Sequence, residues 1–225
     1  MFFVQHMCVR NTILHMKPAT KTVATKNICI FGDSITYGAW DTEGGWADRL
    51  RRSLHARTLQ SRFSEYYWVY NLGIPGDTSG DLLECYRVEC EAREPNSIIF
   101  AIGNNDSSRM VGAIENRVPI ERYRTNMLKL LRDAKKRADT VICVGLTPVD
   151  EKYTTPFDTV CTFSNEQVRC YDTELKNVCI EENISTIDIW SFFDSTNDLF
   201  DGLHPNDRGH KKIHDAIKTF LLEEH

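Results

Sequence analysis

From residue 27 onward, short apolar runs rich in β-branched and aromatic residues alternate with longer segments of helical pattern. Each run is short enough to cross a sheet once. Such alternation is typical of βαβ units around a parallel sheet, so the sequence predicts an α/β fold. Five strands are expected, at residues 27–31, 66–71, 97–102, 140–144 and 185–190.

The segments between these runs carry apolar residues three and four positions apart, which is the spacing of one helix face. Two such stripes occur at 46–54 and 120–131. Ser164 followed by Gln167 resembles a capping box at the start of another helix. The last helix is expected to begin after Asn206.

The connection at 146–163 is long for a compact fold. A loop of this length is either functional or an ordinary surface loop, and both interpretations stay open at this point. On the functional interpretation, Tyr153, Phe157 and Phe163 would line a cleft.

Composition favours one globular domain without a nucleic-acid partner. The 225 residues are 41% hydrophobic and 26% charged, which suits a single core. The net charge of −5 creates no basic field for phosphate backbones. Residues 1–25 have no clear period and no apolar stretch of signal-peptide or transmembrane length, so we expect an extension of uncertain order before a domain at 26–225.

Eight cysteines are scattered along the chain without a CxxC pair or a histidine-rich cluster. This pattern indicates free thiols rather than a zinc site. Cys29 and Cys143 fall inside predicted strands, where cysteine acts as a small hydrophobic residue. Free thiols suit a reducing compartment, so we expect a cytoplasmic protein.

Polar residues follow three of the predicted strands, at the edge where ligands bind in open α/β sheets. Ser34 lies in a Gly-Asp-Ser turn after the first strand, a position that exposes a nucleophile. After the second strand, Gly76 has no Cβ to block a substrate oxygen, so its N–H can serve as an oxyanion donor. After the third, the amide of Asn105 can donate to the same oxygen. Taken alone, each turn is also explained as an ordinary loop after a strand, without any function.

Two Asp-x-x-His pairs near the C-terminus are candidates for the base. The first is Asp201 with His204, and the second is Asp207 with His210. Pro205 restricts the preceding residue to an extended or turn conformation, so the first pair is expected in a loop. Asp207 falls in the first turn of the last helix, where a carboxylate offsets the macrodipole and needs no catalytic explanation.

A metal site is the weaker interpretation of the histidines on the last helix. His210 and His214 are four positions apart and could share an ion, but Lys211 and Lys212 lie between them and no third ligand is evident. No P-loop pattern occurs. We therefore expect neither a metal nor a cofactor.

Four blocks of sequence now stand in order: the three turns that carry Ser34, Gly76 and Asn105, and the segment of the first Asp-x-x-His pair. Together they resemble the SGNH (GDSL-type) esterase and lipase family over residues 27–225, with Ile35 where the family name has leucine. The resemblance implies a three-layer flavodoxin-like fold with a five-stranded parallel sheet. It also implies a serine nucleophile, an oxyanion hole and an Asp–His pair. Carried over residue by residue, these roles fall on Ser34 (nucleophile and backbone donor), Gly76 and Asn105 (oxyanion hole), and Asp201 and His204.

The expected activity is serine-dependent hydrolysis of a small acyl ester through an acyl-enzyme intermediate. An acyltransferase using the same serine site is one alternative. A catalytically idle ligand-binding module on the same fold is another, because fold does not determine function.

Overall fold

A computed structural model describes residues 25–223 of the chain, so the predicted extension lies outside the described residues except for Thr25. Its main sheet has five parallel strands in the order β2-β1-β3-β5-β7. The predicted α/β fold with a five-stranded parallel sheet is therefore confirmed. The strands are β1 (Thr25–Gly32), β2 (Tyr66–Gly73), β3 (Ser97–Ala101), β5 (Thr140–Val144) and β7 (Ser185–Ile187).

The last strand is shorter than predicted. It pairs with β5, and Val144, the last residue of β5, lies opposite Ile187. The N–H of Gly145, the next residue after β5, makes the last contact to the Ile187 oxygen at 2.8 Å, and the strand ends there, three residues before the predicted position 190. The side chain of Asp188, which follows, instead accepts a hydrogen bond from Lys176 Nζ at 2.7 Å.

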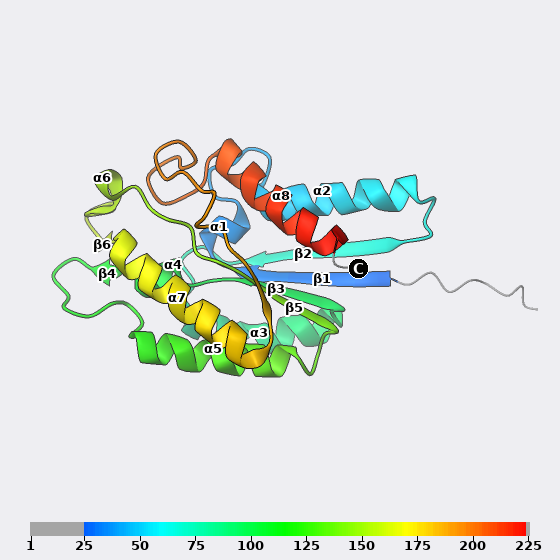
Figure 1. The fold of residues 1–225 in the computed structure, drawn as a ribbon, viewed down its shortest axis with the longest axis horizontal. Coiled ribbons are helices and arrows are strands. Elements are labelled where there is room, and N and C mark those ends of the chain that lie inside the picture. Colours follow the sequence, from blue (N-terminus) through cyan, green and yellow to red (C-terminus); the bar gives the residue numbers. More distant parts are fainter. Residues whose placement is uncertain (1–24, 224–225) are drawn as a thin grey trace, which may run out of the picture.

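Helices cover both faces of the sheet and make three layers (Figure 1). α2 (Gly45–Gln60) and α8 (Asp207–Glu223) pack on one face. α3 (Ser79–Arg93), α5 (Ile120–Ala134) and α7 (Asn165–Glu182) pack on the other. The predicted stripes at 46–54 and 120–131 are the buried faces of α2 and α5.

Alternate residues of β1, an interior strand, serve two separate cores, because successive side chains of a strand point to opposite faces. Cys29 and Phe31 of β1 face α3, α5 and α7. Ile28 and Ile30 face α2 and α8. A parallel sheet buried on both faces explains why the predicted strands read as continuous apolar runs.

Only half of the predicted capping box at Ser164 forms. The Ser164 hydroxyl accepts the backbone N–H of Gln167 and so caps α7. The Gln167 side chain, however, accepts a hydrogen bond from Asn116 Nδ2 at 2.7 Å. A complete capping box occurs instead at the start of α3, between Thr78 and Asp81.

Short elements gather at the carboxyl edge of the sheet, which is the left side of Figure 1. These elements are α1 (Ser34–Tyr37), α4 (Asn104–Ser107), β4 (Arg109–Met110), α6 (Glu151–Thr154) and β6 (Cys161–Thr162). The connection 146–163 contains α6 and β6, and β6 pairs antiparallel with β4.

Every cysteine between residues 25 and 223 is a free thiol, as the spacing predicted. Cys29 and Cys143 are buried in β1 and β5. In the same stretch of chain, no helix has both the length and the apolar character needed to cross a membrane. The cytoplasmic location remains a prediction.

Candidate active site

The structure brings Ser34, His204 and Asp201 into one hydrogen-bonded chain at the carboxyl edge. Ser34 Oγ lies 2.9 Å from His204 Nε2, and His204 Nδ1 lies 2.8 Å from Asp201 Oδ2. Ser34 is the first residue of α1 and is separated from the end of β1 by Asp33 alone. The two residues of the Asp–His pair come from the loop before α8, as Pro205 predicted.

Asp201 holds the loop as well as the imidazole. Its Oδ1 accepts the backbone N–H groups of Leu203 at 3.0 Å and His204 at 2.8 Å. Burial alone would raise the pKa of Asp201, but the hydrogen bonds from the His204 side chain and from these N–H groups hold that pKa below its usual value. An ionised Asp201 favours the tautomer with a proton on Nδ1, which leaves Nε2 free to accept from Ser34.

Asn105 donates one amide hydrogen to a neighbouring turn and keeps the other. Its Nδ2 lies 2.9 Å from the backbone oxygen of Asp77, the residue after Gly76. Because an amide nitrogen has two N–H groups, the second remains free to donate to a ligand. The turn that carries Gly76 therefore orients the Asn105 amide.

Gly76 has a left-handed backbone, with φ of +86°. A Cβ added at this position would meet no atom within 4 Å. The glycine is therefore required by the turn conformation, and crowding by neighbours plays no part. Asn104, the other amide of the third block, is turned away and donates to the backbone oxygen of Thr147 at 3.0 Å.

Two aromatic rings flank the imidazole of His204. The ring centroids of Trp40 and Phe157 lie 6.1 Å and 6.2 Å from that of His204. Trp40 is 66% exposed and has φ of +66°, an uncommon conformation for a bulky residue. Of the loop aromatics predicted to line a cleft, Phe157 lies against His204, Tyr153 is exposed and Phe163 belongs to the core.

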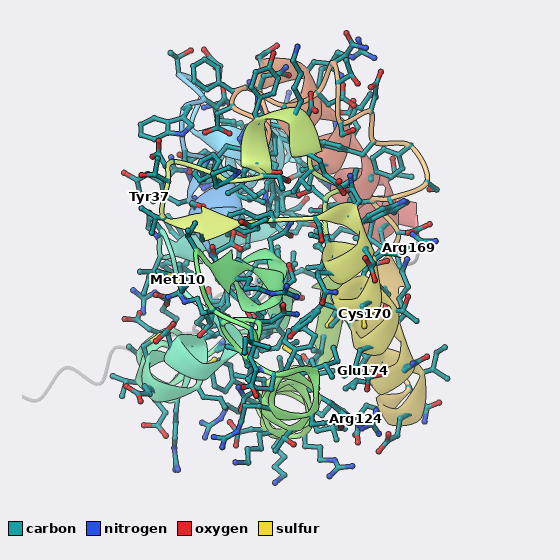
Figure 2. The ribbon with its side chains drawn as sticks, turned by 90° about the vertical axis from the view of Figure 1, so that its left-hand side faces the viewer. Tyr37, Met110, Arg124, Arg169, Cys170 and Glu174 are labelled. Atoms are coloured by element: carbon teal, nitrogen blue, oxygen red, sulfur yellow. The ribbon has the colours of Figure 1, made fainter. Side chains whose placement is uncertain are left out.

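The same edge of the sheet carries further exposed apolar side chains. Figure 2 looks onto this edge, where Tyr37 of α1 and Met110 of β4 lie on the left of the view. Their side chains are 56% and 46% exposed. Ser34 and His204 themselves are nearly buried, at 9% and 8% exposed.

The second Asp-x-x-His pair lies away from the serine. The Asp207 carboxylate pairs with Arg49 Nη2 at 2.5 Å. His210 is fully buried, where its Nδ1 accepts the backbone N–H of Trp46 at 3.3 Å and burial lowers its pKa to about 4. The ring of His214, the other candidate metal ligand, contacts the hydroxyl of Ser53. Each of these residues is thus engaged by α2.

Sequence reasoning missed two buried carboxylates beside the site. Asp33 caps α1 by accepting the N–H of Ile35 at 2.9 Å. Asp106 accepts hydrogen bonds from Ser79 at the start of α3. Burial raises the pKa of each carboxyl to about 6. Their positions beside Ser34 and Asn105 in the sequence were the signal that could have identified them.

The three-layer architecture, with its strand order and its edge of converging loops, defines an SGNH hydrolase fold. The model of the GDSL-like Lipase/Acylhydrolase family matches residues 30–212, and the chain belongs to this family. The resemblance inferred from the four blocks is therefore confirmed, and the protein is a carboxylic ester hydrolase.

Relatives with curated names extend over most of the chain. The "GDSL esterase/lipase WDL1" of Oryza sativa subsp. japonica is 24% identical, covering 86% of this chain and 76% of the relative. The "Isoamyl acetate-hydrolyzing esterase 1 homolog" of Homo sapiens is 25% identical, covering 82% and 76%. Among solved structures, the lipase/acylhydrolase from Enterococcus faecalis has a TM-score of 0.73 at 22% identity, covering 89% of this chain and 97% of that one.

Proposed function

We propose that this hydrolase uses Ser34 as a nucleophile and cleaves small acyl esters through an acyl-enzyme intermediate. The observation that carries the proposal is the continuous chain from Ser34 Oγ through His204 to Asp201, with contacts of 2.9 and 2.8 Å. A serine hydroxyl is a poor nucleophile unless a base takes its proton as it attacks. The imidazole is within hydrogen-bond reach for that transfer.

In the first half-reaction, Ser34 Oγ bonds to the acyl carbon while its proton passes to His204 Nε2. The carbonyl electrons move onto oxygen, which becomes negatively charged. When this intermediate collapses, the bond to the alcohol breaks and His204 protonates the leaving oxygen. Asp201 stays ionised and stabilises the imidazolium in between.

The negative oxygen needs donors that are already in place. The backbone N–H groups of Ser34 and Gly76 and the free amide hydrogen of Asn105 are the donors we propose. Water then attacks the acyl-enzyme with His204 again as base, and Ser34 is regenerated as the carboxylic acid leaves. This chemistry uses no metal or cofactor.

We infer a preference for short acyl chains with a small alcohol. Trp40 and Phe157 lie beside the imidazole of His204 and offer apolar contact there for a small acyl or alcohol group. The human relative is named for hydrolysis of an acetate ester. Rates on p-nitrophenyl esters from acetate to decanoate test this directly, because faster turnover of decanoate would refute it.

The alternatives make different predictions in the same assay. An acyltransferase would hydrolyse the ester slowly until a sugar or other alcohol acceptor is added. A ligand-binding module would bind the ester without turnover. Hydrolysis by the wild-type protein in the absence of an acceptor, lost in Ser34→Ala, supports the hydrolase.

We also infer a cytoplasmic enzyme with its hydrolase domain at residues 26–225 and without a nucleic-acid partner. The free thiols of the described cysteines and the net charge of −5 support these inferences. Fractionation of cells that express the tagged full chain tests the location. Recovery in a secreted fraction would contradict it.

A further inference from the structure

Two of the proposed oxyanion donors, the Gly76 N–H and the Asn105 amide, lie in turns that follow strands which are not adjacent in the sheet. Gly76 follows β2 and Asn105 follows β3, while β1 lies between these strands. The ladder hydrogen bonds therefore do not connect the two turns directly. An oxyanion hole requires its donors within a few tenths of an ångström of their working positions. The Asn105 amide itself bonds to the backbone oxygen of Asp77 at 2.9 Å, and a second contact is needed to fix the two turns independently of that amide.

The carboxylate of Asp106 makes that contact. Ser79, three residues after Gly76, donates its backbone N–H to both Asp106 oxygens at 3.0 Å. The Ser79 hydroxyl donates to Asp106 Oδ1 at 2.5 Å. Asp106 directly follows Asn105, so this contact joins the residue after one donor to the helix that begins just after the other.

A third residue completes the group. Asn126 of α5 donates its side-chain N–H to the Ser79 hydroxyl at 3.0 Å, so this oxygen both donates and accepts. Asp106 and Ser79 are fully buried, and Asn126 is 5% exposed. Hydrogen bonds shielded from water are rigid and costly to break. We call Asp106, Ser79 and Asn126 the buried clamp.

Charge supports the same arrangement. Asp106 approaches the N-terminus of α3, where unpaired N–H groups and the macrodipole stabilise a negative charge. Burial raises the pKa of Asp106 to about 6, against the opposing hydrogen bonds from Ser79, so this carboxyl is mostly ionised at neutral pH. A buried carboxylate is expensive unless it is fully hydrogen-bonded. Asp106 meets this condition through Ser79, and it lies beside an oxyanion donor.

We infer that Asp106 is a positioning residue of the oxyanion hole, which holds the Asn105 amide and the Gly76 turn at the spacing that the transition state requires. The inference depends on the proposed function, because it assigns Asp106 to a site built around Ser34. The clamp touches neither the serine nor the substrate. It acts through the two donors.

Asp106→Asn tests the role with little change in shape. The amide replaces one of the two accepting oxygens with an N–H group and removes the negative charge, so the contacts from Ser79 become weaker. We expect kcat for p-nitrophenyl acetate to fall about 10- to 100-fold, less than for removal of a whole donor, with KM within about two-fold. Ser79→Ala, which keeps the backbone N–H, should give a smaller loss, and the double variant should lose less than the product of the two.

Asp172→Asn is the matched control, because it makes the same chemical change in a carboxylate at the same edge of the sheet. Asp172 is 1% exposed, and it accepts the backbone N–H of Leu146 at 3.0 Å and Lys176 Nζ at 2.8 Å. It contacts neither Gly76 nor Asn105. We expect lower stability with kcat within about three-fold of wild type.

Inhibition by a phenylboronic acid distinguishes positioning from a general loss of structure, because the boron becomes tetrahedral when Ser34 adds to it. In Asp106→Asn the inhibition constant should rise in step with the fall in kcat, and in Asp172→Asn it should not. Wild-type kcat in Asp106→Asn, or a loss no larger than in the control, overturns the inference. If Asp106→Asn does not fold, the same comparison is made with Ser79→Ala. Full activity in Ser34→Ala would instead overturn the proposed function.

Discussion

Two hydrogen-bonded Ser–His–Asp chains occur in the described part of this protein, and their distances are almost the same. In the candidate site, Ser34 to His204 measures 2.9 Å and His204 to Asp201 2.8 Å. Between α2 and α8, Ser53 Oγ lies 2.9 Å from His214 Nε2, and His214 Nδ1 lies 2.9 Å from Asp215. Distance alone would rank the two chains equally.

Their surroundings differ. Ser34 begins a short helix near the end of a strand, beside two turns that have hydrogen-bond donors not used within the described part of the protein. Ser53 lies inside α2, where backbone N–H groups are used by the helix itself. Asp201 is fixed by backbone N–H groups, whereas Asp215 is half exposed and also pairs with Lys211. A triad without free donors beside it can transfer a proton but cannot stabilise an oxyanion.

The largest expected effect separates the two serines. Ser34→Ala should lower hydrolysis of p-nitrophenyl acetate by about 10⁶-fold, the scale seen when a serine nucleophile is removed. Ser53→Ala should stay within about two-fold, because its chain has no oxyanion donors. Initial rates with matched circular dichroism spectra check both. An inactive Ser53→Ala with normal folding would mean that we have chosen the wrong serine.

Substitutions of the histidines should differ in their effect on kcat almost as much as those of the two serines. His204→Ala is expected to be nearly as damaging as Ser34→Ala, and Asp201→Asn should cost up to about 10⁴-fold in kcat through the wrong imidazole tautomer. His210→Ala and His214→Ala should keep near-normal kcat in the folded fraction. A kinetic scan in which His210→Ala is inactive and His204→Ala is not would reverse the assignment.

The neighbouring amides of the third block provide a finer test. Asn105→Ala should lower kcat by about 10²- to 10³-fold, as removal of one oxyanion donor does. Asn104→Ala should affect kcat much less. Instead it should lower the free energy of unfolding by about 1 to 3 kcal/mol, because the buried Thr147 oxygen loses its donor. Greater kinetic sensitivity at Asn104 would shift the oxyanion donor by one residue.

Buried His210 predicts a pH effect on stability rather than on catalysis. Burial lowers its pKa from 6.5 to about 4. As pH falls through 6.5, the unfolded chain binds a proton that the folded protein does not, so the free energy of unfolding decreases. From pH 7 to pH 5 this residue should account for about 1 to 2 kcal/mol.

Urea unfolding of wild type and His210→Gln at both pH values isolates that contribution. Asp33 and Asp106, whose pKa values burial raises to about 6, act in the opposite direction, because their protonation favours the folded state. Both carboxyl groups remain in the variant, so their contributions cancel when the pH dependence of the variant is subtracted from that of wild type. An unchanged pH slope in His210→Gln would show that this histidine does not titrate as its burial implies.

The smallest expected effect is at Asp207, the acid of the rejected pair. Its side chain is 75% exposed, and Arg49 keeps Asp41 as a second partner. Asp207→Asn should lower the free energy of unfolding by about 0.3 to 1 kcal/mol, less at high salt, with kcat unchanged. A large loss of kcat would instead give this carboxylate a place in the chemistry.

The sequence by itself predicted the architecture and named the serine, histidine and aspartate that the structure brings together. Apolar runs with helical segments between them predict a parallel sheet, because each strand needs a crossover before the next. Parallel strands end at one edge, so the turns after three of them had to converge there. Pro205 then separated the two Asp-x-x-His pairs, because its effect on backbone conformation is local.

Contacts between distant residues depended on the tertiary structure. Nothing near Ser53 predicts His214, and nothing near Asp106 predicts Ser79 or Asn126, because which side chains meet depends on how helices pack across the sheet. For the same reason Phe157 reaches His204 while Phe163 joins the core. Local pattern determines which way a residue faces along its own element, and only the packed structure determines what it faces.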